Sequence, residues 1–255
     1  MDAPVYSLCI TLYNNAATVK RALDSILAQI DDRFEVVVVD NYSDDGSREI
    51  LEDYAKRGKI NTLVEKHCSR GLGWQTAVDN SRGEYVVVDL DMDDEFKPEL
   101  GSLLRFYHEK CEGYLLAAVA DLQSAWSKNV TIGPRALVEG LGGWPDVQLY
   151  EHSNVWGKAA LKDRYVWTNF SLVTSVGEHP ERKTTFGRFK FTYMRYRELL
   201  RQGRRPFMPG ERKGPMQYSA YFLARVSAPF MKSFKKGTNR DFNPRDKRYF
   251  VKFEV

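Results

Sequence analysis

Short apolar runs alternate with segments of helical periodicity along residues 5–88. Each run predicts a buried strand, because only a strand covered on both faces stays apolar without alternation. These predicted strands span residues 5–12, 34–39, 60–65 and 85–88. Between them, apolar residues recur every three or four positions, which predicts helices with one buried face at residues 19–30, 43–58 and 71–81.

Alternating strands and helices predict an α/β domain with right-handed crossovers and a parallel sheet. In such sheets, ligands bind beyond the carboxyl ends of the strands. Asp40, Arg70 and the acidic segment 89–94 all lie at or just after predicted strand ends. We therefore expect one edge of the sheet to bring these charged side chains together.

The segment 89–94 contains four carboxylates within six positions, directly after an apolar strand. Carboxylates this crowded repel one another at neutral pH, so a cation is expected among them. Oxygen ligands on a short loop suit a hard divalent ion, which would in turn hold a diphosphate. We place Asp89 within the strand and expect Asp94 to cap or orient the loop. The alternative is a solvated acidic turn.

The chain beyond Pro98 continues with a predicted helix and strands at 115–120, 129–132 and 164–176. A glycine turn at 140–143 precedes a helix that begins near Glu151 or Ser153. From residue 181 onward the composition is basic and aromatic, with helices predicted at 188–201 and 216–234. We therefore expect a domain over residues 1–180 and a mainly helical extension over residues 181–255.

Composition narrows the class of protein. Of the 255 residues, 43% are hydrophobic and 13% are aromatic, which are values typical of globular proteins. No apolar run reaches the roughly 18 residues that a membrane span needs. Three scattered cysteines and four scattered histidines show no metal-ligand spacing, so we expect reduced thiols, a cytoplasmic location and no zinc site.

The charge of the chain is divided unevenly. Residues 1–181 hold 18 Lys and Arg against 29 Asp and Glu, a net charge of −11, whereas residues 182–255 hold 20 against 5, a net charge of +15. The basic residues interleave with 15 aromatic residues. This combination predicts a helix lying on an anionic membrane. Packing against the acidic domain, a homodimer contact and nucleic-acid binding are the alternatives, and no nucleic-acid-binding module supports the last.

Four motifs in order carry a resemblance to a known family: ITLYNN, VVVDNYSDDGS, SRGLGWQTAVDNSRGEYVVVDLDMDDEFKPEL and GGWPDVQLYEHSNVWGKA. Over residues 5–160 the chain resembles the family-2 glycosyltransferases with the GT-A fold. The resemblance implies a mostly parallel central sheet flanked by helices, with a Rossmann-like nucleotide-binding half. It also implies inverting transfer from a nucleotide-sugar donor. The turn after the first strand, at residues 13–15, carries neither a dinucleotide fingerprint nor a phosphate-binding loop.

The resemblance assigns one group of residues to the nucleotide. Thr11 and Tyr13 lie where the first strand meets the base, with Tyr13 as the stacking residue. Asp40 resembles the aspartate that accepts a hydrogen bond from the base, and Arg70 resembles the basic residue near the base or diphosphate. The alternatives are a core-edge tyrosine, a turn aspartate and a surface arginine.

A second group resembles the Asp-x-Asp motif of the family, here Asp91-Met92-Asp93. The resemblance implies that Asp91 contacts ribose or metal, that Met92 lies within the nucleotide-sugar site, and that Asp93 binds Mn²⁺ or Mg²⁺. A divalent ion would neutralise the growing charge of the leaving diphosphate.

The family's Glu-Asp pair, which supplies the general base, reads Glu151-His152 in this chain. Glu151 is our preferred base. His152 and Asp146 are the alternatives, and His152 has an ordinary pKa suited to proton transfer near neutral pH. Gly143 and Trp144 lie in the region that faces the acceptor in the family, with Trp144 as a sugar-stacking platform or a core indole.

These observations predict a metal-dependent inverting hexosyltransferase for glycan biosynthesis. Its acceptor would be a glycan or a polyprenyl-linked glycan, and its location would be the cytoplasm or the cytoplasmic face of a membrane. The alternatives are a catalytically weak transferase-like module that binds membranes or partners, and a sugar-phosphate nucleotidyltransferase. The latter would need a glycine-rich loop after the first strand, where this chain has Tyr13 to Asn15.

Overall fold

A computed structural model describes residues 3–119, 129–146, 151–175, 185, 189, 192–194, 196–197, 200, 215–227 and 245–253. The elements of the first half are β1 (Tyr6–Leu12), α1 (Val19–Leu27), β2 (Phe34–Asp40), α2 (Ser47–Lys56), β3 (Thr62–Glu65), α3 (Arg70–Asp79), β4 (Tyr85–Val88), β5 (Glu95–Phe96) and α4 (Leu100–Lys110). Those that follow are β6 (Leu115–Val119), β7 (Asn129–Pro134), α5 (Arg135–Gly140), α6 (Glu151–Ala160), β8 (Tyr165–Thr168), β9 (Val173–Ser175), α9 (Pro215–Ser227) and η2 (Lys247–Tyr249).

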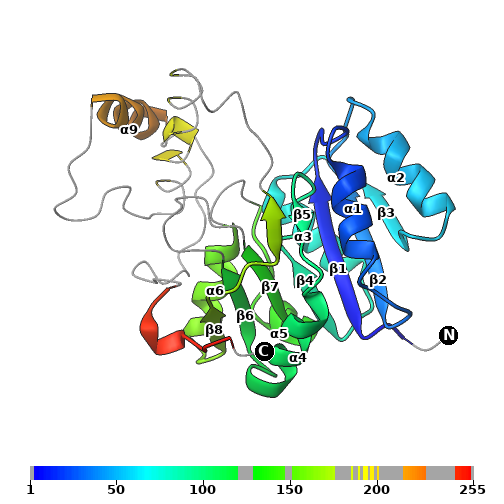
Figure 1. Cartoon of the computed structure of the whole chain (residues 1–255). Coiled ribbons are helices and arrows are strands. Elements are labelled where there is room, and N and C mark those ends of the chain that lie inside the picture. The colour runs from blue at the N-terminus through cyan, green and yellow to red at the C-terminus, as the bar shows by residue number, and fades with distance from the viewer. Residues whose placement is uncertain are drawn as a thin grey trace. The chain divides into compact units, whose positions relative to one another are not determined.

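The central sheet has seven strands in the order β3-β2-β1-β4-β7-β6-β8 (Figure 1). Parallel pairing joins β3 to β2, β2 to β1, β1 to β4 and β6 to β8. Strand β7 runs antiparallel to both of its neighbours, β4 and β6. The predicted α/β class with a mostly parallel sheet is therefore confirmed.

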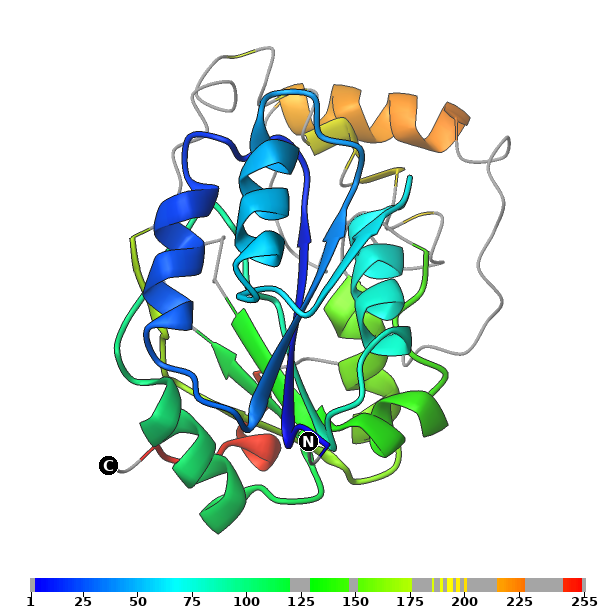
Figure 2. The same cartoon turned by 90° about the vertical axis from the view of Figure 1, so that its right-hand side faces the viewer.

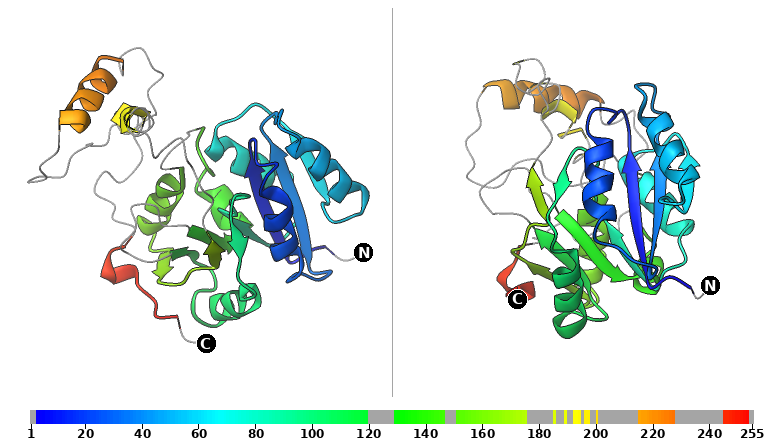
Figure 3. Two further views of the ribbon diagram at one scale, coloured as in Figure 1. Left: turned by 45° about the horizontal axis from the view of Figure 1, so that its top comes forward. Right: turned by 45° about the vertical axis from the view of Figure 1, so that its right-hand side comes forward.

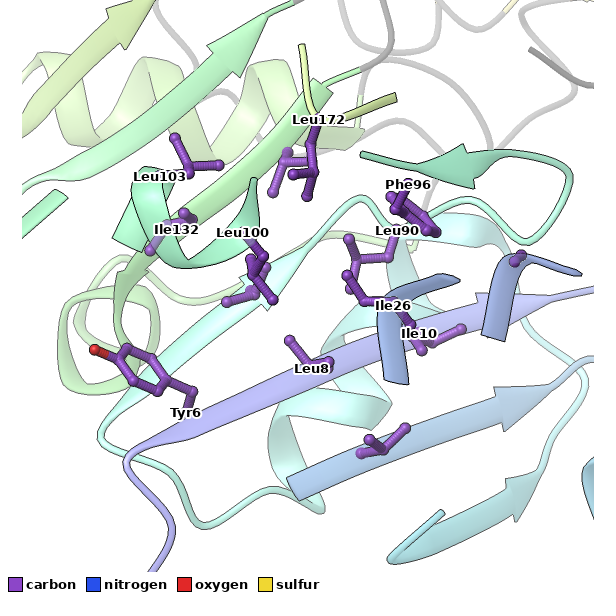
Figure 4. Close-up of a cluster of buried hydrophobic side chains, with 14 of the residues drawn as sticks. Tyr6, Leu8, Ile10, Ile26, Leu90, Phe96, Leu100, Leu103, Ile132 and Leu172 are labelled. Carbon is purple, nitrogen blue, oxygen red and sulfur yellow. The ribbon is translucent and has the colours of Figure 1, made fainter. Parts of the chain in front are cut away.

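Helices cover both faces of this sheet (Figure 2), and a hydrophobic layer lies between the sheet and the helices on each face. Successive side chains of a strand point to opposite faces, so Leu8 and Ile10 pack in one layer and Cys9 packs in the other. The first layer contains residues of α1, α2 and α4, and Figure 4 shows Ile26 and Leu100 within it. The second layer contains residues of α3, α5 and α6. Burial on both faces explains why the strands are continuously apolar.

Several element boundaries differ from the predicted ones. Helix α2 begins at Ser47, because Gly46 adopts φ 98 and ends the preceding turn. The predicted strand 164–176 divides into β8 of the central sheet and β9, which pairs with β5 in a second sheet. Strand β4 ends at Val88, and Asp89 adopts φ 70, which a strand residue cannot adopt. The placement of Asp89 within the strand was therefore wrong.

Residues near the end of the sequence pack with the first part of the chain. The indole Nε1 of Trp167 donates to the Asp246 carbonyl at 2.9 Å, and the Val251 amide donates to the Trp167 carbonyl at 2.9 Å. Figure 3 shows η2 (red) on the β8 side of the sheet. Contacts accordingly divide the chain into one unit of Met1–Gly177 with Phe242–Val255, and a second unit of Glu178–Asp241. The division at residues 180 and 181 stays a prediction.

The second unit contains α9, where the sequence predicts a helix at 216–234. Residues 228–234 lie outside the described part of the chain, as do most residues of the predicted helix 188–201. Among the described residues, no helix is both long enough and apolar enough to cross a membrane.

Candidate active site

Hydrogen bonds connect the three loops that follow β1, β2 and β3, at the carboxyl ends of these strands. After β1, the Asn14 amide donates to Ser43 Oγ at 3.0 Å, and its side chain exchanges hydrogen bonds with Asp44. After β3, the Cys68 amide donates to Asn41 Oδ1 at 2.9 Å. Strand ends that are adjacent in the sheet are thus fixed to one another, and they carry the side chains that the sequence assigned to the nucleotide.

These side chains occupy different positions on the edge. Tyr13 is exposed, whereas Asp40 is buried and accepts hydrogen bonds from the Ser43 hydroxyl at 2.6 Å and the Ser43 amide at 3.2 Å. Such bonds are those of a turn aspartate. Thr11 lies against Gly73 of α3, where any Cβ would collide with the threonine hydroxyl. The roles of Thr11, Tyr13 and Asp40 toward a nucleotide stay predictions.

An aromatic pair lies near Asp40 that the sequence did not predict. Tyr42 follows β2 and His67 follows β3, and their rings stack with centroids 4.0 Å apart and planes inclined by 27°. Both side chains are exposed, and Tyr42 adopts φ 57. The available signal was an aromatic residue directly beyond a buried strand end, at a position where a polar turn residue is usual.

The acidic loop after β4 brings three carboxylates together. Asp91, Asp93 and Asp94 each offer one oxygen, and these oxygens lie within 4.8 Å of one another. Asp94 is buried and the other two are half-buried. Three hard oxygen donors on one loop are the donor set that Mg²⁺ or Mn²⁺ takes. The structure therefore places Asp94 with the proposed ligands, whereas the sequence had suggested a capping role.

The loop is fixed through its backbone. The Met92 carbonyl accepts from Thr18 Oγ1 at 2.8 Å, and the Asp93 carbonyl accepts from Arg21 Nη2 at 3.3 Å. The Met92 side chain is buried in the hydrophobic layer with α1. A nucleotide-binding role for that side chain is not supported, because it points into the core. Met92 instead anchors the loop that carries its acidic neighbours.

Arg70, the first residue of α3, is a cationic side chain near these carboxylates. Its Nη1 lies 3.8 Å from Glu151 Oε1, and 40% of its side chain is exposed. The charge of Asp91 raises the pKa of Arg70 most, burial opposes this, and the charges of Glu151, Asp89 and Asp93 raise it further. Arg70 thus connects the acidic loop electrostatically to α6.

Glu151 opens α6 and is the best placed of the three candidate bases. Its side chain is 2% exposed and faces Arg70 across the site edge. Asp146 lies on an exposed turn before the helix. His152 belongs to α6, but its side chain lies outside the described part of the chain. The geometry therefore favours Glu151, as the sequence preferred, and the assignment stays a prediction.

The glycine turn before α6 carries a buried indole. Gly142 and Gly143 adopt φ 77 and φ 60, and a Cβ on Gly143 would collide with the Gln75 side chain. The Trp144 amide donates to Gln75 Oε1 at 2.8 Å, and its ring packs edge-on against Trp74. Only 3% of Trp144 is exposed. The ring belongs to the hydrophobic layer that contains residues of α3 and α6, so the structure supports the core interpretation.

Asp89 is a buried carboxylate whose partners the sequence did not reveal. It accepts a hydrogen bond from Thr131 Oγ1 at 2.5 Å. Burial raises the pKa of Asp89 well above its ordinary value, and the nearby charges of Glu151 and Asp91 raise it too, against the hydrogen bond from Thr131 and the charge of Arg70. A strand-end aspartate was visible in the sequence, but its partner on β7 lies 42 residues away.

Comparison with known proteins gives a family and a fold. The sequence model of glycosyl transferase family 2 matches residues 7–161. EpsH of Bacillus subtilis is 30% identical over 101 residues, which are 39% of this chain and 29% of EpsH. The poly(ribitol-phosphate) beta-glucosyltransferase of Bacillus spizizenii is 26% identical over 155 residues, covering 59% of this chain and 23% of that protein. The chain thus spans less than a third of the length of either relative.

Among solved structures, the fold is similar to that of the mannosyltransferase PcManGT from Pyrobaculum calidifontis in complex with GDP-Man and Mn²⁺. The TM-score is 0.62 at 21% sequence identity, and the match covers 89% of this chain and 70% of PcManGT. At that identity, the likeness is one of fold.

Proposed function

The chain belongs to glycosyl transferase family 2, and we propose that it moves a sugar from a nucleotide-diphosphate sugar to an acceptor hydroxyl with inversion. One observation carries the proposal. Arg70 lies 3.8 Å from Glu151 and interacts electrostatically with Asp91 and Asp93 of the three-carboxylate loop, so the proposed metal-diphosphate site and the proposed base would adjoin. Neither a solvated acidic turn nor a surface arginine requires this arrangement.

The donor would be held by the loops of β1 to β4. Tyr13 would stack on the base, Asp40 would accept from it, and Thr11 would line the strand end. Asp91, Asp93 and Asp94 would hold Mn²⁺ or Mg²⁺, which would neutralise charge on the leaving diphosphate. Arg70 would bind diphosphate oxygens through its guanidinium donors. The Mn²⁺ and GDP-Man bound to PcManGT support this class of ligand.

Glu151 would act on the acceptor. In an inverting displacement the acceptor oxygen attacks the anomeric carbon from the side opposite the diphosphate, and a carboxylate there accepts the hydroxyl proton. The bond from the anomeric carbon to the diphosphate oxygen breaks as the new glycosidic bond forms. Burial of Glu151 at the start of α6 restricts the carboxylate to few orientations, which favours efficient proton transfer.

The test combines a donor screen with substitution of the base. UDP and GDP sugars are assayed for metal-dependent hydrolysis and transfer to glycan acceptors, and donor binding is measured by calorimetry with Mn²⁺. We expect Glu151→Gln to bind the donor as tightly as wild type and to lose more than about 100-fold in transfer rate. Glu49→Gln on exposed α2 is the control. Wild-type turnover in Glu151→Gln would move the base to His152 or Asp146.

The acceptor class is proposed from the second unit. Helix α9 exposes Tyr218, Phe222, Leu223 and Val226, each between 47% and 66%, whereas its buried side carries Ala220 and Ala224. Large apolar side chains gathered on an exposed helix face are typical of an interaction site. The second unit, residues 178–241, holds 16 Lys and Arg against 5 Asp and Glu, a net charge of +11, so we propose an anionic membrane as the partner of this face. A polyprenyl-linked or polymeric glycan acceptor at the membrane would fit, and the poly(ribitol-phosphate) relative is consistent with a polymeric acceptor.

Vesicle binding tests the membrane proposal. Removing residues 182–255 would also remove the segment that bonds to Trp167, so a single substitution is the better probe. We expect Leu223→Glu to weaken co-sedimentation with vesicles of phosphatidylglycerol and phosphatidylcholine by about 10-fold, because it places a charge in the apolar face. Leu161→Glu, at an exposed leucine of the first unit, should bind like wild type. Equal vesicle binding by the two variants would reject the proposal. If wild type is a dimer and Leu223→Glu is a monomer, the exposed face of α9 instead binds a second copy of the chain.

A further inference from the structure

Three buried residues form a continuous chain of hydrogen bonds behind the candidate site. Trp156 Nε1 donates to Thr131 Oγ1 at 3.2 Å, and Thr131 Oγ1 donates to Asp89 Oδ2 at 2.5 Å. The indole N–H donates to the threonine hydroxyl, and the hydroxyl donates to the carboxylate, so both bonds run in the same direction, from α6 toward Asp89.

The chain joins the two halves of the site through β7. Asp89 directly follows β4, and the last residue of β4, Val88, pairs with Thr131 of β7. One residue separates Asp89 from Asp91, the first of the three clustered carboxylates. Trp156 lies on α6, five residues after Glu151. All three residues of the chain are buried. Besides Arg70, therefore, a residue of β7 connects the end of β4 to α6.

We propose that Thr131 is a positioning residue that fixes the base-bearing helix relative to the acidic loop. The inference rests on the proposed function and deepens it. The loop has anchors of its own, from Thr18 and Arg21 to its backbone. The bond from Trp156 joins helix α6 to β7 directly. Loss of the threonine hydroxyl should therefore displace Glu151 more than it displaces the donor.

A matched control separates positioning from burial. Thr168 on β8 is as fully buried as Thr131 and belongs to the same sheet. Within the described part of the chain, its hydroxyl makes no hydrogen bond. Thr131→Val and Thr168→Val remove the same atoms from equally buried sites, and only the first breaks a chain that reaches the candidate site.

The kinetic experiment compares these variants with the donor and acceptor that wild type uses. We expect Thr131→Val to lower kcat by about 10- to 100-fold with the donor KM within about 2-fold, because a misplaced base slows proton transfer without weakening donor binding. Thr131→Ser should restore kcat, and Thr168→Val should leave it unchanged. Trp156→Phe should behave like Thr131→Val, and the double variant should be no slower than either.

Wild-type kcat in Thr131→Val, an equal loss in Thr168→Val, or no recovery in Thr131→Ser would overturn the inference. If Thr131→Val does not fold, Thr131→Ser and Trp156→Phe supply the same comparison. These outcomes differ from failure of the proposed function, in which wild type itself transfers no sugar.

A second readout does not need turnover. The indole N–H resonance of Trp156, identified by its absence in Trp156→Phe, is followed by ¹H–¹⁵N NMR as Mg²⁺ is added with UDP or GDP. The hydrogen-bond chain predicts a shift of this resonance in wild type that disappears in Thr131→Val. A wild-type resonance that stays in place while calorimetry shows Mg²⁺ and nucleotide bound would overturn the inference, whereas a loop that binds no Mg²⁺ would contradict the proposed function.

Discussion

One carboxylate is buried at the amino ends of the central strands (the amino edge) and another at their carboxyl ends (the carboxyl edge). The surroundings of these two carboxylates are opposite in character. At the amino edge, Glu35 accepts hydrogen bonds from Ser7 Oγ at 2.6 Å, from the Gly83 amide at 3.0 Å and from the Arg82 amide. At the carboxyl edge, Asp89 has the Thr131 hydroxyl and otherwise faces further carboxylates and Arg70. The first carboxylate is surrounded by donors, and the second belongs to a crowd of like charges.

The pKa directions express this difference. Burial raises the pKa of Glu35, but the bonds from Ser7, Arg82 and Gly83 outweigh it and hold the pKa below its ordinary value. Burial and neighbouring charge hold the pKa of Asp89 well above its ordinary value. A buried carboxylate that is fully hydrogen-bonded stabilises a fold, whereas one left among like charges costs stability and marks a site that awaits a ligand.

The largest effect is expected at the carboxyl edge. Asp93→Asn should abolish metal-dependent nucleotide-diphosphate binding, by more than about 100-fold, because it removes a ligand oxygen's charge. The same change relieves repulsion, so the melting temperature should stay equal or rise. Calorimetry with Mn²⁺ and UDP or GDP measures the first effect, and thermal unfolding measures the second.

Asp32→Asn, at an exposed aspartate between α1 and β2, is the control for that experiment. Unchanged nucleotide affinity in Asp93→Asn would remove the acidic loop from the donor site. A clear loss of stability would show that the two edges are alike.

At the amino edge, removing the charge of the buried carboxylate should lower the stability of the fold. Glu35→Gln places an amide among N–H donors and should lower the free energy of unfolding by about 2–3 kcal/mol, because buried donors lose their charged acceptor. Transfer per folded molecule should be unchanged. Urea denaturation and assay of the same samples check this, with exposed Glu49→Gln as the neutral control. A stable but inactive Glu35→Gln would contradict the division between the edges.

The pH dependence of stability should sharpen the contrast. Because the folded pKa of Glu35 lies below its ordinary value of 4.5, its contribution is complete above that pH and is lost as the pH falls through the folded value. Urea midpoints of wild type should therefore fall more steeply below about pH 4.5 than those of Glu35→Gln. Parallel pH profiles would show that Glu35 contributes nothing through its charge.

The smallest effects concern two glycines. Gly143→Ala should lower the free energy of unfolding by about 1–2 kcal/mol, because its φ of 60 and the Gln75 side chain leave no room for a Cβ. Gly101→Ala, in α4 and with open space around it, should raise it by about 0.5–1 kcal/mol. Thermal unfolding compares the pair, and a stabilised Gly143→Ala would mean that the turn before α6 adjusts freely.

The sequence was most informative where the physics is local. Continuous apolar runs located β1, β2 and β4, and the order of motifs located the acidic loop and Glu151. Hydrogen-bond partners that lie far apart in the chain could not be predicted from the sequence. The Thr131 hydroxyl, for example, donates to Asp89 from a strand 42 residues away. The sequence also could not decide which residues of the site motifs are buried. Trp144 and Met92 belong to such motifs, and both side chains pack in the core. The cation expected among the carboxylates was partly visible as Arg70, but its pairing with Glu151 required the fold.

The bonds between Trp167 and residues 246 and 251 bear on how the protein is made. They connect β8 to a segment that the ribosome delivers only after all of Glu178–Asp241. The second unit is thus an insertion in the first. Phe253 of that segment packs against Phe106 and Phe170, so these two rings gain this partner only after Glu178–Asp241 has been synthesised. Chaperones bind exposed hydrophobic surfaces, so the yield of folded protein should depend on the length of the insertion as well as on its sequence.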